Sequence, residues 1–263
     1  MTLRLRTVSR LRTVSRLPAS FACRKSSRPF SQSPFVGALP AEVHEKVPKA
    51  MWDFHVSGGY CCGALLRERG TNPLASLVAT LGRLPPATPK GAKQPSVVTV
   101  HSEHCDATSG VRWRRFFPPS SSLESRWYWN EERQLAVDSF TYLGIRDFAA
   151  FGFRLEPMTW EEFEREKGDA AAARAISGIR KPHPCGGDFV GFKHVTEAVW
   201  ILGVPIPRSL ALIADGISMP HTDGGGWWVE VEVEHGLLGR IVSYRGDVRV
   251  GAEGGEFDLN FDE

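Results

Sequence analysis

Three residues with the alternating spacing of a β-strand, Trp113, Arg115 and Phe117, could form a binding site for a charged group. Successive strand side chains point to opposite faces, so these three share one face and place a guanidinium between aromatic rings. On a buried face, Arg115 would need a carboxylate or an anionic ligand. On an exposed face, the trio would be a cation–π patch. An internal ion pair with Asp138 or Asp147 is the favoured interpretation, because buried arginines are usually paired, and a ligand contact is the alternative.

A second group, His101, Glu103 and Cys105, most resembles a set of metal ligands, because these residues would share one face of a strand while His104 points away. No CxxC pair or zinc-finger spacing occurs among the five cysteines. Polar residues at a strand end explain the group equally well. The sequence therefore predicts no metal site and no cofactor, with copper or zinc binding as the alternative interpretation.

Catalytic residues are not identifiable from the sequence. His44, Asp53 and His55 could form an acid–base group, but no candidate nucleophile accompanies them. Ser125 lacks the GxSxG motif of a nucleophile elbow. The glycines at 224–226 precede an expected strand rather than a helix, so they predict a turn and not a phosphate-binding loop. Whether the protein is an enzyme stays open at this point.

The elements that would position Arg115 are expected to be successive antiparallel strands. Each is separated from the next by a short turn, whereas a parallel partner would need a crossover of about a dozen residues. Trp127 and Trp129 share one face of the second of these strands. The four expected strands are Val111–Phe117, Ser125–Glu131, Leu135–Tyr142 and Gly144–Leu155.

Elsewhere the pattern predicts few helices. Pro73–Leu84 is expected to be helical, with Asn72 as its cap and with an apolar stripe formed by Leu74, Leu77, Val78 and Leu81. A weak helical period precedes Pro48, and Phe54–Leu66 is expected to be extended and glycine-rich. The segment 158–188 is expected to be an inserted, highly charged helix that begins with the capping box Thr159–Glu162.

The last third of the chain resumes the strand pattern. In Trp227–Glu234 apolar and acidic residues alternate, so that Trp227 and the valines face inward. Pro205 and Pro207 exclude a central strand around them and predict an edge position. We therefore expect a mainly β (α+β) fold, a strongly curved antiparallel or barrel-like sheet with one or two N-terminal-side helices and an inserted helix. A two-layer α+β fold with an open sheet is the alternative.

The N-terminal segment, residues 1–34, differs from the rest in composition. It carries eight basic residues and is rich in serine and threonine, and no acidic residue precedes Glu42. This composition is typical of an organellar transit peptide, and Arg28 lies three residues before a processing site that resembles those of mitochondria. A mitochondrial matrix location is predicted, with a plastid as the alternative.

Without that segment the charge changes sign. Of 32 basic and 30 acidic residues, 24 and 30 lie beyond residue 30, which gives a net charge of −6. This argues against nucleic acid as a partner. No apolar stretch approaches the roughly 18 residues of a membrane span, so no transmembrane segment is predicted. Residues 35–250 are expected to form one domain, with an acidic tail at 251–263.

Several ordered motifs support a resemblance to a known family. They are Leu39–Pro40 with His44, Trp113–Phe116, Ser125, Leu202–Pro207 and Gly239–Gly246. In these the chain resembles the uncharacterised domain-of-unknown-function family number 4166, which occurs alone or fused to saccharopine-dehydrogenase-like Rossmann modules. The resemblance covers roughly residues 35 to 250 and implies no catalytic residues. The chain itself has no GxGxxG turn, so it lacks that dinucleotide-binding module.

Three classes of function remain. The favoured one is a non-catalytic mitochondrial module that binds an apolar or amphipathic small molecule, with Arg115 holding an acidic head group. The others are an enzyme or auxiliary domain that works with an oxidoreductase, and a structural or assembly protein that uses the edge near Val204. The expected ligand-binding residues are Trp113, Arg115, Phe117, Trp127 and Trp129.

Overall fold

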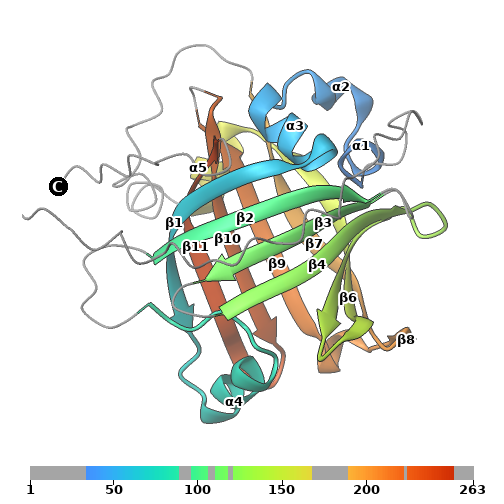
Figure 1. Cartoon of the computed structure of the whole chain (residues 1–263), viewed down its shortest axis with the longest axis vertical. Coiled ribbons are helices and arrows are strands. Elements are labelled where there is room, and N and C mark those ends of the chain that lie inside the picture. Colours follow the sequence, from blue (N-terminus) through green and yellow to red (C-terminus); the bar gives the residue numbers. More distant parts are fainter. Residues whose placement is uncertain are drawn as a thin grey trace, which may run out of the picture.

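The curled sheet dominates the computed structural model, which describes residues 34–88, 96–105, 110–117, 121–167, 189–221 and 224–251. Every pairing is antiparallel, and neighbours follow the order β6-β5-β4-β3-β2-β1-β11-β10-β9-β7-β8. Because β6 also pairs with β7, the strands other than β8 form a closed ring (Figure 1). The expected mainly β, strongly curved antiparallel fold is confirmed. The strands are β1 (Gly59–Arg69), β2 (Ser96–Cys105), β3 (Gly110–Phe117), β4 (Ser121–Asn130), β5 (Leu135–Tyr142), β6 (Ile145–Met158), β7 (Gly191–Ile201), β8 (Val204–Pro205), β9 (Leu212–Pro220), β10 (Gly226–His235) and β11 (Gly239–Gly251).

The ring is weakest between β7 and β9, where backbone pairing covers only Phe192–His194. Beyond that point side chains replace the ladder: the Thr196 amide donates to the Asp215 carboxylate at 2.8 Å, and the Ala214 amide donates to the Thr196 hydroxyl at 3.1 Å. The chain between the two strands forms the two-residue strand β8 and the short helix η1 (Arg208–Leu210). Pro205 thus lies at a sheet edge, as its missing amide hydrogen requires.

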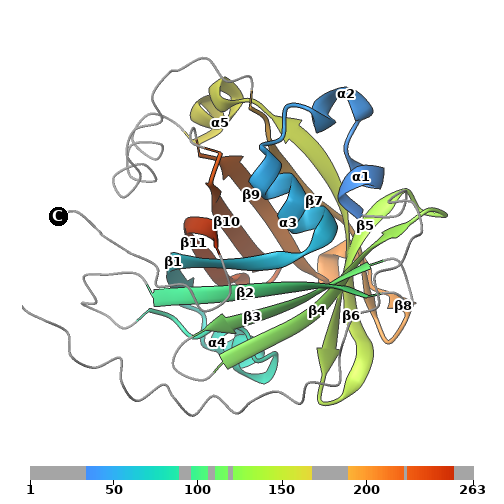
Figure 2. The same ribbon diagram turned by 45° about the horizontal axis from the view of Figure 1, so that its top comes forward.

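Three helices precede the sheet and cover one of its ends: α1 (Pro34–Ala38), α2 (Ala41–His44) and α3 (Lys49–Ser57). Figure 2 shows α3 lying across that end, and it contacts β1, β2, β3, β10 and β11. Its Met51 and Phe54 are at most 1% exposed in the main core. The extended conformation expected from Phe54 onward was wrong for 54–57, because Pro48 starts a helix here and Gly58, with φ of 81°, ends it.

Helix α4 (Pro73–Leu81) lies at the opposite end (Figure 1). Its predicted cap is confirmed, since the Asn72 side chain accepts a hydrogen bond from the Leu74 amide at 2.9 Å. Of the predicted apolar stripe only Val78 packs against the sheet, and its three leucines are exposed. The fully buried side chains are Ala75 and Ala79, which pack against Ile241 and its neighbours, because small side chains permit close approach to the sheet.

Helix α5 (Trp160–Lys167) covers the outer surface of the sheet. Its capping box is confirmed, because the Thr159 amide donates to Glu162 at 2.8 Å and the Glu162 amide donates to the Thr159 hydroxyl at 3.3 Å. Although most of its faces are charged, Phe163 is only 1% exposed and packs with Met219 and Trp228. The remainder of the expected insertion, like residues 1–33 and the acidic tail, lies outside the described residues.

Candidate functional site

The interior of the curled sheet holds a buried ion pair. Arg115 on β3 points inward, donates from Nη1 to the Ser125 hydroxyl at 2.8 Å, and lies 3.2 Å from Asp138 Oδ2 through Nη2. Ser125 and Asp138 face the same interior from β4 and β5, because opposite residues of adjacent antiparallel strands share a face. The guanidinium also lies 4.8 Å from the centre of the Trp113 ring. The ion pair expected between Arg115 and Asp138 is therefore present, whereas Asp147 pairs with Arg126 instead.

Polar atoms around this pair keep unused hydrogen-bonding capacity. Within the described residues, Asp138 Oδ1 and Trp113 Nε1 are buried and have no hydrogen-bond partner. Burial raises the pKa of Asp138, while Arg115 and Ser125 oppose that rise. Burial likewise raises the pKa of Tyr244, an inward residue of β11 that lies close enough to feel both charges. An acceptor and a donor that are both unpaired are costly in a dry core and therefore indicate a site for a polar partner.

Aromatic side chains surround the polar cluster. Phe117 and Trp127 are nearly fully buried, at 1% and 4% exposure. Trp113 and Trp129, which face the same interior, are only partly buried and pack against the core. These two side chains therefore keep some accessible surface, while the rings of Trp113, Phe54 and Trp127 pack with centres 5.2 to 5.8 Å apart. All five residues predicted to bind a ligand thus face one interior: Trp113, Arg115, Phe117, Trp127 and Trp129.

Two neutral histidines complete the lining. His55 on α3 stacks on Phe35 with ring centres 4.7 Å apart, and desolvation lowers its pKa to about 4. His194 on β7 stacks on Trp127 at 6.0 Å, and desolvation, with smaller contributions from His55 and Arg115, lowers its pKa to about 3. Both are uncharged at neutral pH, so the charged groups of the interior are the Arg115–Asp138 pair and Arg67, whose buried guanidinium lies 5.8 Å from the centre of the Phe117 ring.

The suggested acid–base group of His44, Asp53 and His55 does not form. His44 lies against Trp52 and bonds the Leu39 carbonyl oxygen, and Asp53 pairs with Lys49 at the surface. His55 faces the interior instead. Helical geometry separates these side chains, which the sequence alone had placed in one region.

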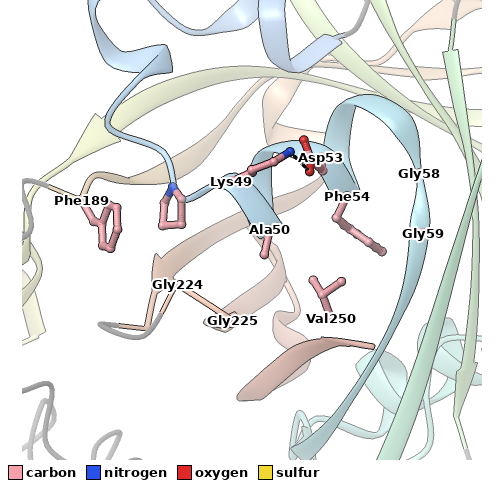
Figure 3. Close-up of a pocket in the computed structure, with 11 residues that line it drawn as sticks. Lys49, Ala50, Asp53, Phe54, Gly58, Gly59, Phe189, Gly224, Gly225 and Val250 are labelled. Carbon is pink, nitrogen blue, oxygen red and sulfur yellow. Dashed lines mark hydrogen bonds and ion pairs between the residues drawn. The ribbon is translucent and has the colours of Figure 1, made fainter. Parts of the chain in front are cut away.

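A cavity of about 620 Å³ opens at the end of the sheet beneath α3 (Figure 3). Ala50 and Phe54 form one wall, Gly224, Gly225 and Val250 face them, and Pro48 also lines the cavity. Phe54 also contacts the interior, because its ring lies 5.2 Å from both Trp113 and Trp227. Phe54 therefore contacts both the outer cavity and the aromatic interior.

Sequence reasoning missed four parts of the site: His194, Tyr244, Phe54 and the outer cavity. A signal for the first two was available, since both lie at inward positions of alternating strands. The outer cavity depends on how α3 crosses the sheet, which no local pattern specifies. The side chains of His101, Glu103 and Cys105 lie outside the described part of the chain, and no cluster of potential metal ligands occurs within it. No helix among the described residues is long and apolar enough to cross a membrane.

Comparison with known families confirms the resemblance over the last part of the chain, which holds the motifs Leu202–Pro207 and Gly239–Gly246. Residues 186–248 match the family model of a domain of unknown function (DUF4166). This match spans β7 to most of β11, so it includes His194 and Tyr244 but not Arg115. Searches of curated proteins and of solved structures gave no significant match.

Proposed function

We propose that this protein binds a small amphipathic molecule inside the curled sheet. The apolar part of the ligand lies against Trp113, Trp127 and Trp129, and its polar end meets Arg115 and Asp138. One observation supports this most strongly: partly accessible aromatic side chains surround a buried Asp138 oxygen that has no described partner. Small closed antiparallel sheets with such interiors commonly hold one ligand.

The polar end of the ligand is better matched by a hydroxyl than by a carboxylate. Asp138 and Ser125 already balance and bond the Arg115 guanidinium. The atoms left over are an acceptor, Asp138 Oδ1, and a donor, Trp113 Nε1. A hydroxyl donates to the first and accepts from the second, whereas a carboxylate would bring a second negative charge towards Asp138. The acidic head group expected from the sequence remains the competing ligand class.

Access would pass through the outer cavity. It is lined largely by apolar atoms and ends at Phe54, whose ring touches the interior. Rotation of that ring would connect the cavity with the tryptophans. Side-chain rotamer changes of this kind are ordinary responses to ligand binding.

Calorimetric titration with farnesol and with farnesoic acid tests the proposal, since the two share one skeleton and differ in the polar end. We expect saturable binding of the alcohol, and weaker or undetectable binding of the acid. The double variant Arg115→Met/Asp138→Asn removes both charges together and should lower the affinity for farnesol. The matched control is Arg126→Met/Asp147→Asn, which removes an ion pair on the outer side of the same sheet. Equal affinity in both double variants, or no binding by the wild type, would refute the site.

A second candidate function, assembly with a larger structure, is favoured by one observation. Val204, which lies beside Pro205 at the edge of the sheet, is 60% exposed. The exposed surface around it extends well beyond that edge.

A further inference from the structure

Exposed apolar side chains gather at one end of the molecule. Among the described residues, every large apolar side chain that is more than half exposed lies in one of four connections at the end of the sheet that carries α4. Their exposed fractions run from 52% to 78%. We call this set the leucine rim; it consists of Leu74, Leu77, Leu81, Leu143, Leu202, Val204, Leu210 and Leu237.

The four connections form one continuous surface. The Tyr142 hydroxyl donates to the Leu81 carbonyl oxygen at 2.5 Å, which joins the β5–β6 turn to α4. The Leu202 amide donates to the Phe148 carbonyl oxygen at 2.8 Å, which joins the β7–β8 turn to the start of β6.

Two further contacts link η1, the β10–β11 turn and α4. Gly236 packs against Ser209: a Cβ atom built on Gly236 would lie 3.6 Å from the Ser209 carbonyl oxygen. This contact joins η1 to the β10–β11 turn. The Asn72 side chain donates to the Leu238 carbonyl oxygen at 3.4 Å. This hydrogen bond joins the β10–β11 turn to the residue that caps α4. The rim therefore encircles this end of the sheet.

The charges on the tips of these connections are of one sign, and the nearest carboxylates, Asp147 and Glu234, flank two of the tips. Residues 70–86, 143–146, 201–210 and 235–240 contain no aspartate or glutamate, but they contain Arg83, Arg146, Arg208 and Arg240. Arg240 is balanced by Glu232 on the adjacent strand. Arg83 lies 5.9 Å from the centre of the Tyr142 ring, Arg208 donates to the Thr196 carbonyl oxygen at 2.8 Å, and no carboxylate among the described residues pairs with these two or with Arg146. Apolar tips with uncompensated positive charge complement an anionic surface.

The side-chain types distinguish a bilayer from a protein partner. Protein interfaces concentrate their binding energy in tryptophan, tyrosine and arginine, and leucine is under-represented among such residues. The rim is entirely aliphatic and contains no aromatic residue. Aliphatic side chains on separate turns can enter the acyl-chain boundary one by one, while arginines remain with the headgroups.

We propose that the leucine rim docks this protein onto the surface of an anionic lipid bilayer. This proposal does not depend on the proposed ligand, because the rim lies on the outer surface at the α4 end of the sheet, whereas α3 covers the other end.

Vesicle co-sedimentation tests the proposal with full-length protein. We expect binding to phosphatidylcholine vesicles that contain about one-third phosphatidylserine, and much weaker binding to phosphatidylcholine alone. Leu77→Ser/Leu81→Ser should lower the partition coefficient at least about tenfold, because two exposed leucines lose their membrane contact. Arg146→Gln should lower it about fivefold on the anionic vesicles only.

The matched control changes two exposed apolar residues on the outer wall of the sheet, outside the rim, Leu66→Ser/Phe116→Ser, and should bind vesicles like the wild type. Circular dichroism melts verify that each variant is folded. Absence of wild-type binding to the anionic vesicles, or equal loss in rim and control variants, would overturn the proposal. So would analytical ultracentrifugation that shows wild-type dimers dissociated by Leu77→Ser/Leu81→Ser without lipid binding, since the rim would then join two copies of the chain.

Discussion

Replacing Arg115 by methionine should destabilise the protein and make its stability depend on pH. The substitution keeps the apolar stem but leaves Asp138 buried without its cation. The two side chains are 14% and 10% exposed and lie 3.2 Å apart, so little solvent can replace the lost partner. Breaking a buried pair of this kind costs about 3 to 5 kcal/mol. Urea unfolding at neutral pH measures that loss.

The pH dependence follows from the carboxyl group. Burial already raises the pKa of Asp138 in the folded state, and loss of Arg115 removes the main opposing influence. A carboxyl whose folded pKa exceeds its unfolded value takes up a proton more readily when folded, so stability falls as pH rises through that interval. The destabilisation of Arg115→Met should therefore shrink as the pH is lowered towards the unfolded pKa of aspartate. Arg115→Met/Asp138→Asn should recover part of the loss at neutral pH. A cost below about 1 kcal/mol, or a loss independent of pH, would refute the assigned pairing.

Three further predictions concern other parts of the chain. Phe163→Ala should cost about 3 to 5 kcal/mol in denaturant unfolding, because its buried ring packs beside Trp228, and an unchanged midpoint would show that α5 does not stabilise the sheet. His55 and His194 have lowered folded pKa values of about 4 and about 3, so stability should fall as pH drops from about 6.5 towards those values. His194→Phe should weaken this loss of stability at acid pH in a pH series of thermal melts. An unchanged dependence on pH would contradict the uncharged state of His194 in the folded protein. Deletion of residues 1–34 should leave a tagged protein in the cytosol by fluorescence microscopy, and retained mitochondrial signal would exclude the transit peptide.

Local patterns accounted for much of the sheet. Short turns around Asn130 and Leu143 allow only hairpins, and strict alternation placed Trp227 on the inner face. The same alternation placed Trp113 and Arg115 together, and Asp138 was one of two named partners. These features depend on neighbouring residues or on one strand pair.

Features that depend on distant contacts could not be predicted in this way. The sheet closes where β6 pairs with β7, and in the sequence these two strands are separated by α5 and the segment that follows it. The apolar stripe of α4 did not identify its buried face, because close packing against β11 selected the small side chains of Ala75 and Ala79. His55 joins the interior only because α3 crosses the end of the sheet.

The most direct test of the central claim is a nuclear Overhauser experiment on the protein with bound farnesol. The proposal predicts contacts from the isoprenoid chain to the indole protons of Trp113 and Trp127. It also predicts that the Trp113 Nε1 proton shifts when the alcohol binds. Contacts confined to Ala50 and Val250 in the outer cavity, or no contacts to either tryptophan, would contradict an interior binding site.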